Sequence, residues 1–297
     1  MTLEEYECPI KEIHSVGQFI EAIENNPRID DYACFRGEAK DFGKKRLTAS
    51  GLRSMTTSRN VILCQDFYSE VHSKLTQNEK ENFLAFCQHH GLPTNLLDIT
   101  SNPLIALFFA CYGNDYIIND SYVYGFYGYM TNVTESIKKI SFKNIFDTSL
   151  DYFYRNKNLK KDILYYLKNS HLAYSNINEN NELNKHKYSL LNKWIKILES
   201  NDDFDYYPDE ILKLIDRSVY SPLLSFERAT YQHGKFLFQW YTYYEKQNII
   251  PDCIFQIPSI KKIDILKTLD KLNINRASLF QDYDNIAKYI KEKHGYK

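Results

Sequence analysis

The chain has 297 residues, a formal net charge of −1 and a hydrophobic content of 43%. This composition supports a globular body with a substantial core, and the even charge balance argues against a general electrostatic attraction to nucleic acid or anionic membranes. The apolar runs are far shorter than a membrane span, and the first residues do not resemble a signal peptide. We therefore expect a cytoplasmic protein with no membrane partner.

The six cysteines are scattered without a Cys-x-x-Cys pair, and several of them lie within apolar stretches. A thiol in such a stretch behaves as a small hydrophobic side chain. We therefore expect neither a disulfide framework nor a zinc site, and no residue is predicted to bind a metal.

The first elements are a helix and a strand. Ser15-x-x-Gln18 predicts the start of an amphipathic helix that ends near residue 25. Residues 32–35 are predicted to form a strand that stops at Arg36-Gly37, where a charged side chain is followed by a conformationally permissive glycine. The polar residues 41–58 are expected to form a loop, and residues 60–75 a helix.

Residues 88–110 combine polar groups with elements that are too apolar for a surface. A helix that starts at residues 78–81 is predicted to end at Gly91, because glycine readily adopts the left-handed conformation and Pro93 prevents continuation. Residues 95–99 are short, apolar and bounded by polar residues. They are predicted to form a strand in the core.

The following helix is predicted to be an interior one. Ser101 or Asn102 can cap it, with Pro103 at its first position, and residues 104–110 are apolar on nearly every side. This leaves a polar corner at Thr100-Ser101 between two buried elements. Polar side chains in such a place are either fully hydrogen-bonded or line a site.

The rest of the chain alternates strands and helices without an internal repeat. Strands are predicted at residues 121–129, 235–241 and 252–257, and helices along a stripe of Ile260, Ile263, Leu266 and Leu269 and over residues 284–293. Residues 131–221 are predicted to form a mainly helical insertion. The expected fold class is α+β, with a mixed sheet core, flanking helices and this insertion.

Three segments resemble the FRG family, which is named after its Phe-Arg-Gly motif. They are Phe35-Arg36-Gly37, the block at residues 88–110 and the segment at residues 227–236, and residues 278–284 resemble the closing motif of the family. Because these pieces occur in order, we expect a single FRG-type domain over residues 1–297. The chain departs from the family at Asn95, where an arginine is usual, and at Ile99, where a tryptophan is usual.

The FRG architecture in turn resembles the ADP-ribosyltransferase fold. The arginine class of that fold has an arginine at the end of an early strand, a Ser-Thr-Ser corner before a helix, and a late acidic motif. Arg36-Gly37 and Thr100-Ser101 match the first two features in order. No Glu-x-Glu occurs in the last third of the chain, and the nearest match by position is Glu227 to Gln232.

This resemblance implies NAD as the substrate and cofactor. Arg36 would hold the pyrophosphate by a planar, charge-assisted fork, and the hydroxyl of Thr100 or Ser101 would orient the nicotinamide ribose. Cleavage of the glycosidic bond develops oxocarbenium character, which Glu227 or Asp98 would stabilise. Gln232 would orient the reacting groups by hydrogen bonds, although it could instead satisfy backbone groups near a strand.

The residues that the resemblance assigns to cofactor binding share these three segments. They are Phe35, Arg36, Gly37, Gln88, His89, Asp98, Thr100, Ser101 and Arg228. Structural alternatives stay open for several of them. Arg36 could form a strand-end ion pair, His89 could bond the last carbonyls of its helix, Asp98 could cap the next helix or bond Arg228, and Thr100 or Ser101 could act as the cap.

The function implied by the resemblance is that of an NAD-dependent ADP-ribosyltransferase-like enzyme. Such an enzyme would act as a bacterial toxin or an anti-phage effector that modifies RNA or protein, with an antitoxin as a further partner. The absence of Glu-x-Glu favours an alternative, which is a non-catalytic module that binds a nucleotide or a partner. A hydrolase that processes nucleotides is the third alternative.

Overall fold

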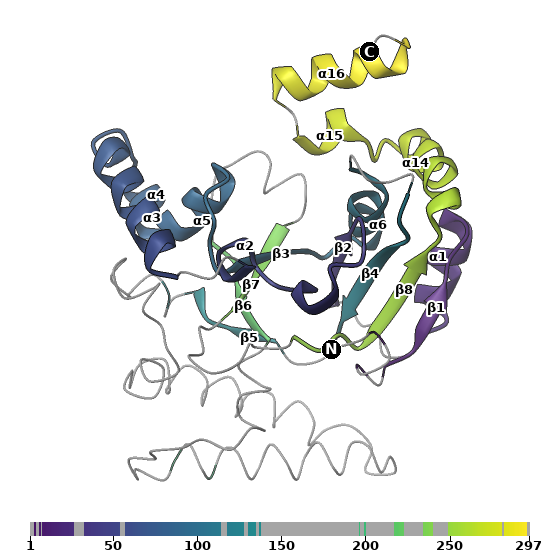
Figure 1. Cartoon of the computed structure of the whole chain (residues 1–297), viewed down its shortest axis with the longest axis horizontal. Coiled ribbons are helices and arrows are strands. Elements are labelled where there is room, and N and C mark those ends of the chain that lie inside the picture. The colour runs from purple at the N-terminus through teal and green to yellow at the C-terminus, as the bar shows by residue number, and fades with distance from the viewer. Residues whose placement is uncertain are drawn as a thin grey trace.

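The sheet is the framework of the molecule. The computed structural model describes residues 3, 6, 8–26, 33–53, 57–113, 118–127, 130–134, 137, 196, 199, 217–222, 234–239, 249–280 and 282–295. Within these residues, eight strands form one sheet in the order β1-β8-β4-β2-β3-β7-β6-β5 (Figure 1). The strands are β1 (Ile10–Glu12), β2 (Cys34–Glu38), β3 (Leu96–Thr100), β4 (Ser121–Phe126), β5 (Thr131–Asn132), β6 (Ser218–Tyr220), β7 (Gly234–Phe238) and β8 (Cys253–Ile257).

The sheet is mixed, which confirms the α+β class. The β1–β8 and β5–β6 pairs are parallel, and the other neighbours are antiparallel. β2 is paired with β4 over five residues, whereas β2 and β3 share the single register pair Phe35 and Thr100. The two central strands therefore have very different amounts of backbone pairing on their two sides.

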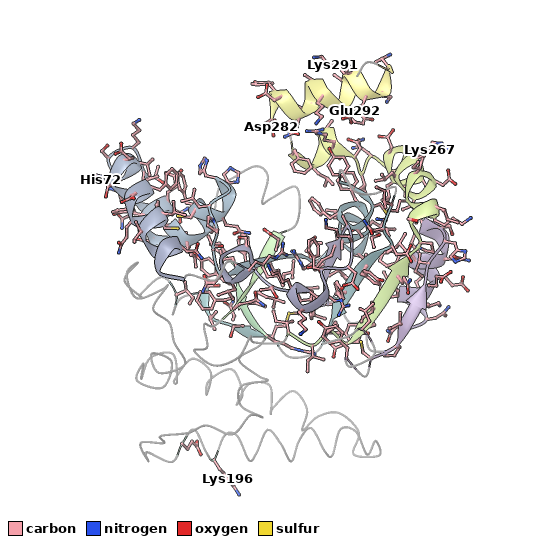
Figure 2. The ribbon with its side chains drawn as sticks, viewed as in Figure 1. His72, Lys196, Lys267, Asp282, Lys291 and Glu292 are labelled. Carbon is pink, nitrogen blue, oxygen red and sulfur yellow. The ribbon has the colours of Figure 1, made fainter. Side chains whose placement is uncertain are left out.

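Helices flank this framework. They are α1 (Val16–Glu24), the 3-10 helix η2 (Gly43–Lys45), α2 (Ser50–Arg53), α3 (Thr57–Val71), α4 (Gln77–Glu81), α5 (Phe83–His89), α6 (Pro103–Cys111), the 3-10 helix η3 (Ser259–Lys261), α14 (Lys262–Lys271), α15 (Arg276–Phe280) and α16 (Tyr283–Lys293). In Figure 1, α3, α4 and α5 gather at one end of the sheet and α14, α15 and α16 at the other. Arg276 of α15 and Glu292 of α16 form a 3.4 Å ion pair near the carboxyl end (Figure 2). None of the described helices is both long and apolar enough to cross a membrane.

Apolar side chains cover both faces of the sheet. Phe35, Val123 and Phe255 face α1, α6 and α14, and they pack with the buried side chains of those helices. Tyr124 and Leu237 belong to the cluster on the opposite face, together with Leu47 and Ala49 from the segment after β2. Burial on both faces stabilises the fold at roughly 25 cal/mol per Å² of apolar surface removed from water.

The predicted interior helix is confirmed as α6. The side chain of Asn102 accepts a hydrogen bond from the amide of Leu104 at 2.9 Å, and Pro103 occupies the first helical position. Most of its apolar side chains are buried. The left-handed residue that ends the preceding helix is Gly91, with φ of 79°, as the sequence predicts.

The predicted end of β2 at Arg36-Gly37 is wrong, because the strand continues to Glu38. A Cβ atom on Gly37 would lie 2.0 Å from the carbonyl oxygen of Ala106 and 2.5 Å from the amide nitrogen of Ala110. The glycine therefore serves the close approach of β2 to α6, which is a role that glycine fills in strands as well as in turns.

Two further predictions, a loop at residues 41–58 and one continuous helix up to Gly91, differ from the structure. The segment expected as a loop at residues 41–58 contains η2, α2 and the first two residues of α3. The helix expected from residues 78–81 to Gly91 is divided at Asn82, and α4 begins with a capping box in which Thr76 and Glu79 bond each other's backbone amides. Short polar helices of this kind give weak periodic signals, so they are easily assigned to loops or merged.

The predicted stripe is wrong for Ile260, which lies in η3, and for Ile263, whereas Leu266 and Leu269 pack against the core. Ile260 is 79% exposed and Ile263 is 43% exposed, while Lys262, Ile265 and Leu269 are buried. The amine of Lys262 donates a hydrogen bond to the carbonyl oxygen of Ala39 at 2.8 Å, directly after β2. The buried face includes a lysine because its charged end is satisfied by a backbone carbonyl, which an apolar pattern cannot reveal.

The described ends of the segment at residues 131–221 are strands. β5 and β6 pair with each other, and β6 also pairs with β7, so both ends of this stretch belong to the sheet. The helical character expected for the rest of the segment falls almost entirely outside the described residues.

Candidate functional site

Arg36 is held where the β2–β3 pairing stops. Its Nε donates a hydrogen bond to Oε1 of Glu38 at 3.0 Å, and its Nη1 donates to the carbonyl oxygen of Asp98 at 2.9 Å. The guanidinium thereby supplies β3 with a donor beyond the single backbone pair of these strands. The side chain is 15% exposed, and Nη2 makes no hydrogen bond to any residue that the structure describes.

Glu38 is the buried counter-charge of this site, and it is not among the site residues predicted from the sequence. Its side chain is 0% exposed, and Oε1 also accepts a hydrogen bond from the amide of Leu47 at 3.3 Å. Oε2 is buried without a hydrogen-bond partner among the described residues. Its position two residues after Arg36 could have indicated it, because alternate residues of a strand have their side chains on the same face.

Arg53, at the end of α2, is the second guanidinium near Glu38. Its Nη2 lies 3.9 Å from Oε1 of Glu38, and its Nε donates to the carbonyl oxygen of Thr48 at 2.7 Å. The guanidinium carbon lies 4.7 Å from the centre of the Phe42 ring. Burial, together with the positive charge of Arg36, lowers the pKa of Arg53. Arg53 is not predicted from the sequence as a site residue, because it lies in the segment interpreted as a loop.

Asp98 is the exposed carboxylate of the site. It lies in the middle of the otherwise buried strand β3, its side chain is 65% exposed, and its Oδ2 is 4.0 Å from Nη1 of Arg36. Gln88 donates from Nε2 to the same oxygen at 3.1 Å. The alternative in which Asp98 caps the next helix is wrong, since Asn102 fills that position.

The Thr100-Ser101 corner separates into an inner and an outer hydroxyl. Thr100 is buried, and its hydroxyl oxygen accepts a hydrogen bond from the amide of Asn102 at 3.1 Å, as expected for a residue that supports the cap. Of the two residues at this corner, only Ser101 is exposed.

Phe35 and Gly37 hold β2 against the core. Phe35 is buried in the cluster that faces α6, and Gly37 contacts the α6 backbone. His89 is half-buried at the end of α5, with its ring 5.0 Å from that of His90. Phe35 and Gly37 therefore position Arg36 from within the fold.

Three of the predicted site residues, Glu227, Arg228 and Gln232, lie outside the described residues. The chain is described again from Gly234, which is the register partner of Thr100 on β3. The predicted roles of these three residues therefore stay predictions.

The two departures from the FRG pattern have structural roles. Asn95 is buried, and its Nδ2 donates a hydrogen bond to the carbonyl oxygen of Gln239 at 3.1 Å. Gln239 in turn donates to the carbonyl oxygen of Leu47 at 2.7 Å and accepts from the amide of Ala49 at 2.5 Å. Ile99 packs in the cluster beneath the same segment. These residues fix the chain that leads from Glu38 to Arg53.

The cysteines and the clusters of possible metal ligands can be compared with the sequence predictions. Among the described residues, no group of three or more His, Cys, Asp or Glu side chains is arranged to hold a metal ion. All six cysteines are free thiols.

Comparison with known proteins assigns a family to one part of the chain. Neither the curated proteins nor the solved structures include a match to the chain. The family model described as the FRG domain matches residues 31–116, which contain β2, α2, β3 and α6 and thus Arg36, Glu38, Arg53 and Asp98. Residues 31–116 of this chain are therefore an FRG domain.

Proposed function

We propose that the protein is an NAD-dependent ADP-ribosyltransferase-like enzyme. The observation that carries this proposal is the Arg36 guanidinium, which is oriented by Glu38 and by the Asp98 carbonyl and whose Nη2 donates to none of the described residues. An oriented guanidinium with free donors suits a phosphate group, which it can bind by two parallel charge-assisted hydrogen bonds. The pyrophosphate of NAD would occupy this position.

The reaction would break the bond between the nicotinamide nitrogen and the ribose carbon C1′. Nicotinamide leaves with the electron pair of that bond, and the ribose develops oxocarbenium character. The carboxylate of Asp98, exposed and oriented by Gln88, would stabilise this positive charge. A nucleophile on the acceptor then forms the new bond to C1′ and loses its proton.

The remaining residues take supporting roles in this proposal. The exposed hydroxyl of Ser101 is better placed than that of the buried Thr100 to contact the nicotinamide ribose. Glu227 stays an alternative source of the carboxylate, and Gln232 a residue that orients the reacting groups. The acceptor would be RNA or protein, as expected of a toxin or an anti-phage effector.

A second candidate is a module that binds the nucleotide without turnover. The specific observation in its favour is that Oδ2 of Asp98 lies 4.0 Å from Nη1 of Arg36 and accepts from Gln88, so its charge is already partly balanced. The buried Glu38 cannot replace it, because its side chain has no exposed surface.

The experiment incubates the full chain with NAD labelled in the adenylate phosphate and with a cell lysate. Transfer of label to a macromolecule, together with release of nicotinamide, supports the transferase, and digestion with ribonuclease or protease identifies the acceptor class. Asp98→Asn should reduce the transfer, whereas Asp264→Asn, in an exposed pair with Lys267 (Figure 2), should not. Binding of NAD without release of nicotinamide would favour the second candidate, and absence of binding would contradict both.

A further inference from the structure

We infer that Arg36 and Arg53 form one anion site that spans Glu38 and takes a diphosphate group in preference to a monophosphate. This inference rests on the proposed nucleotide site but requires no turnover. It assigns a ligand contact to Arg53, and it gives the site a defined chemical class of ligand, which is a nucleoside diphosphate or its esters.

The geometry follows from a shared oxygen atom. Nε of Arg36 lies 3.0 Å from Oε1 of Glu38, and Nη2 of Arg53 lies 3.9 Å from the same atom. Because both distances end on one oxygen, these two nitrogens are no more than about 7 Å apart, the sum of the two distances. The two guanidinium groups are thus neighbours, although they come from a strand and from a helix.

Among the described residues, only one buried carboxylate faces these two cations. The nearest fully buried carboxylate is that of Glu38, and both arginines share a single oxygen of it. Asp98 adds a second negative charge, but its side chain is 65% exposed and the interaction is screened by water. The lowered pKa of Arg53, to which Arg36 contributes after burial, has the direction expected of two cations that repel each other.

Within the described part of the chain, both guanidinium groups have N–H donors that no residue uses. Each guanidinium carries five N–H groups. Arg36 uses Nε and one hydrogen of Nη1, and Arg53 donates from Nε to Thr48, so no described residue accepts from Nη2 of Arg36 or from Nη1 and Nη2 of Arg53 at hydrogen-bond distance. The two sets of remaining donors can address two linked phosphoryl groups.

The site is also pre-organised. Arg36 is bonded to the Asp98 carbonyl, and Arg53 is bonded to the Thr48 carbonyl and lies over the Phe42 ring. Groups that are fixed before binding lose less conformational entropy when the ligand arrives. Two linked phosphoryl groups can accept from both guanidinium groups at once, whereas a single phosphoryl group can be centred on only one of them.

Isothermal titration calorimetry on the full chain tests this inference with ADP, AMP, inorganic pyrophosphate and inorganic phosphate. We expect ADP to bind at least about tenfold more tightly than AMP, and pyrophosphate more tightly than phosphate. Arg53→Gln should remove most of the ADP preference and leave the AMP affinity within about threefold, because only the second phosphate loses its contact. Arg276→Gln is the control, since Arg276 pairs with Glu292 near the carboxyl end.

Equal affinities for ADP and AMP, or an unchanged ADP preference in Arg53→Gln, would overturn the inference. Thermal melting confirms that each variant is folded, and Arg53→Lys replaces Arg53→Gln if the latter does not fold, with a smaller loss expected. The two proposals fail separately. ADP selectivity without release of nicotinamide from NAD supports this inference and contradicts the transferase, while NAD turnover that is indifferent to Arg53 contradicts this inference alone.

Discussion

The hydroxyl group of Thr94 donates a hydrogen bond to Oε1 of Gln88 at 2.5 Å, and this bond decides which end of the amide faces Asp98. The oxygen of Thr94 already accepts from the amide of Leu96 at 3.1 Å, so its hydrogen is directed to Gln88. Oε1 of Gln88 therefore points to Thr94, and its Nε2 points to the carboxylate. A buried threonine thus orients an exposed acid through an intermediate side chain.

Thr94→Val should release this orientation while keeping the shape of the side chain. The amide of Leu96 loses its hydrogen-bond acceptor. The side chain of Gln88 is no longer held in one orientation, and in the flipped orientation its oxygen would face the Asp98 carboxylate, so the hydrogen bond to Asp98 would be lost. We expect a loss of roughly 1–3 kcal/mol in the free energy of unfolding, measured by urea denaturation. In the NAD assay, kcat should fall more than KM changes, and Thr94→Ser should restore both. Full activity in Thr94→Val would show that Gln88 is oriented without this hydroxyl.

Gly37→Ala should destabilise the protein strongly. The new Cβ would overlap the Ala106 carbonyl and the Ala110 amide of α6, which are backbone atoms that cannot turn aside. We expect a loss of about 3 kcal/mol or more, measured by urea denaturation. Gly17→Ala is the matched control, because a Cβ there meets only the Ser15 hydroxyl at 3.9 Å, within α1. This control should gain roughly 0.5–1 kcal/mol.

Glu38→Gln should destabilise the fold by removing the charge between Arg36 and Arg53. Two neighbouring guanidinium groups then lose their shared counter-charge, and loss of one partner from a buried pair costs about 3–5 kcal/mol. Glu292→Gln serves as the comparison, because its pair with Arg276 is half exposed and should contribute about 1 kcal/mol or less. Thermal and urea denaturation measure both variants, and equal losses would argue against a special role for Glu38.

The segment after β2 should become less stable in acid. Burial alone would raise the pKa of Asp41, but hydrogen bonds from Arg46 and from the Gly43 amide outweigh it and lower that pKa. The unfolded chain therefore takes up the proton at a higher pH than the folded one, and this stabilisation is lost as the pH falls below about 4 and through the lower folded value. Melting temperatures between pH 7 and pH 3 should decrease less steeply in Asp41→Asn than in the parent chain.

Local signals were sufficient for the elements around the site. Asn102 and Pro103 at the start of α6, and Gly91 at the end of α5, act on residues within one turn of themselves, so the sequence reveals them. The same holds for the predicted strands that became β3, β4 and β8, whose apolar residues are consecutive or alternate. These predictions depend on neighbours in the chain only.

The parts that the sequence did not reveal depend on tertiary contacts. Arg53 meets Glu38 because Gln239, which is 190 residues from Ala49, fixes the intervening chain. Gly37 is required by a helix that is formed about 70 residues later, and the buried position of Lys262 by a carbonyl group at residue 39. A glycine or a lysine has several common structural roles, and its tertiary contacts determine which of these roles it has.

The unequal pairing of β2 has a consequence for the limits of the FRG domain as a folding unit. The matched segment, residues 31–116, contributes β2 and β3, which share one register pair. The strands that pair with them over five residues each, β4 and β7, lie beyond its end. Cut out of the chain, the segment would expose two long unpaired strand edges, which favour aggregation. The stretch that is recognisable as a family is thus shorter than the stretch that must fold together.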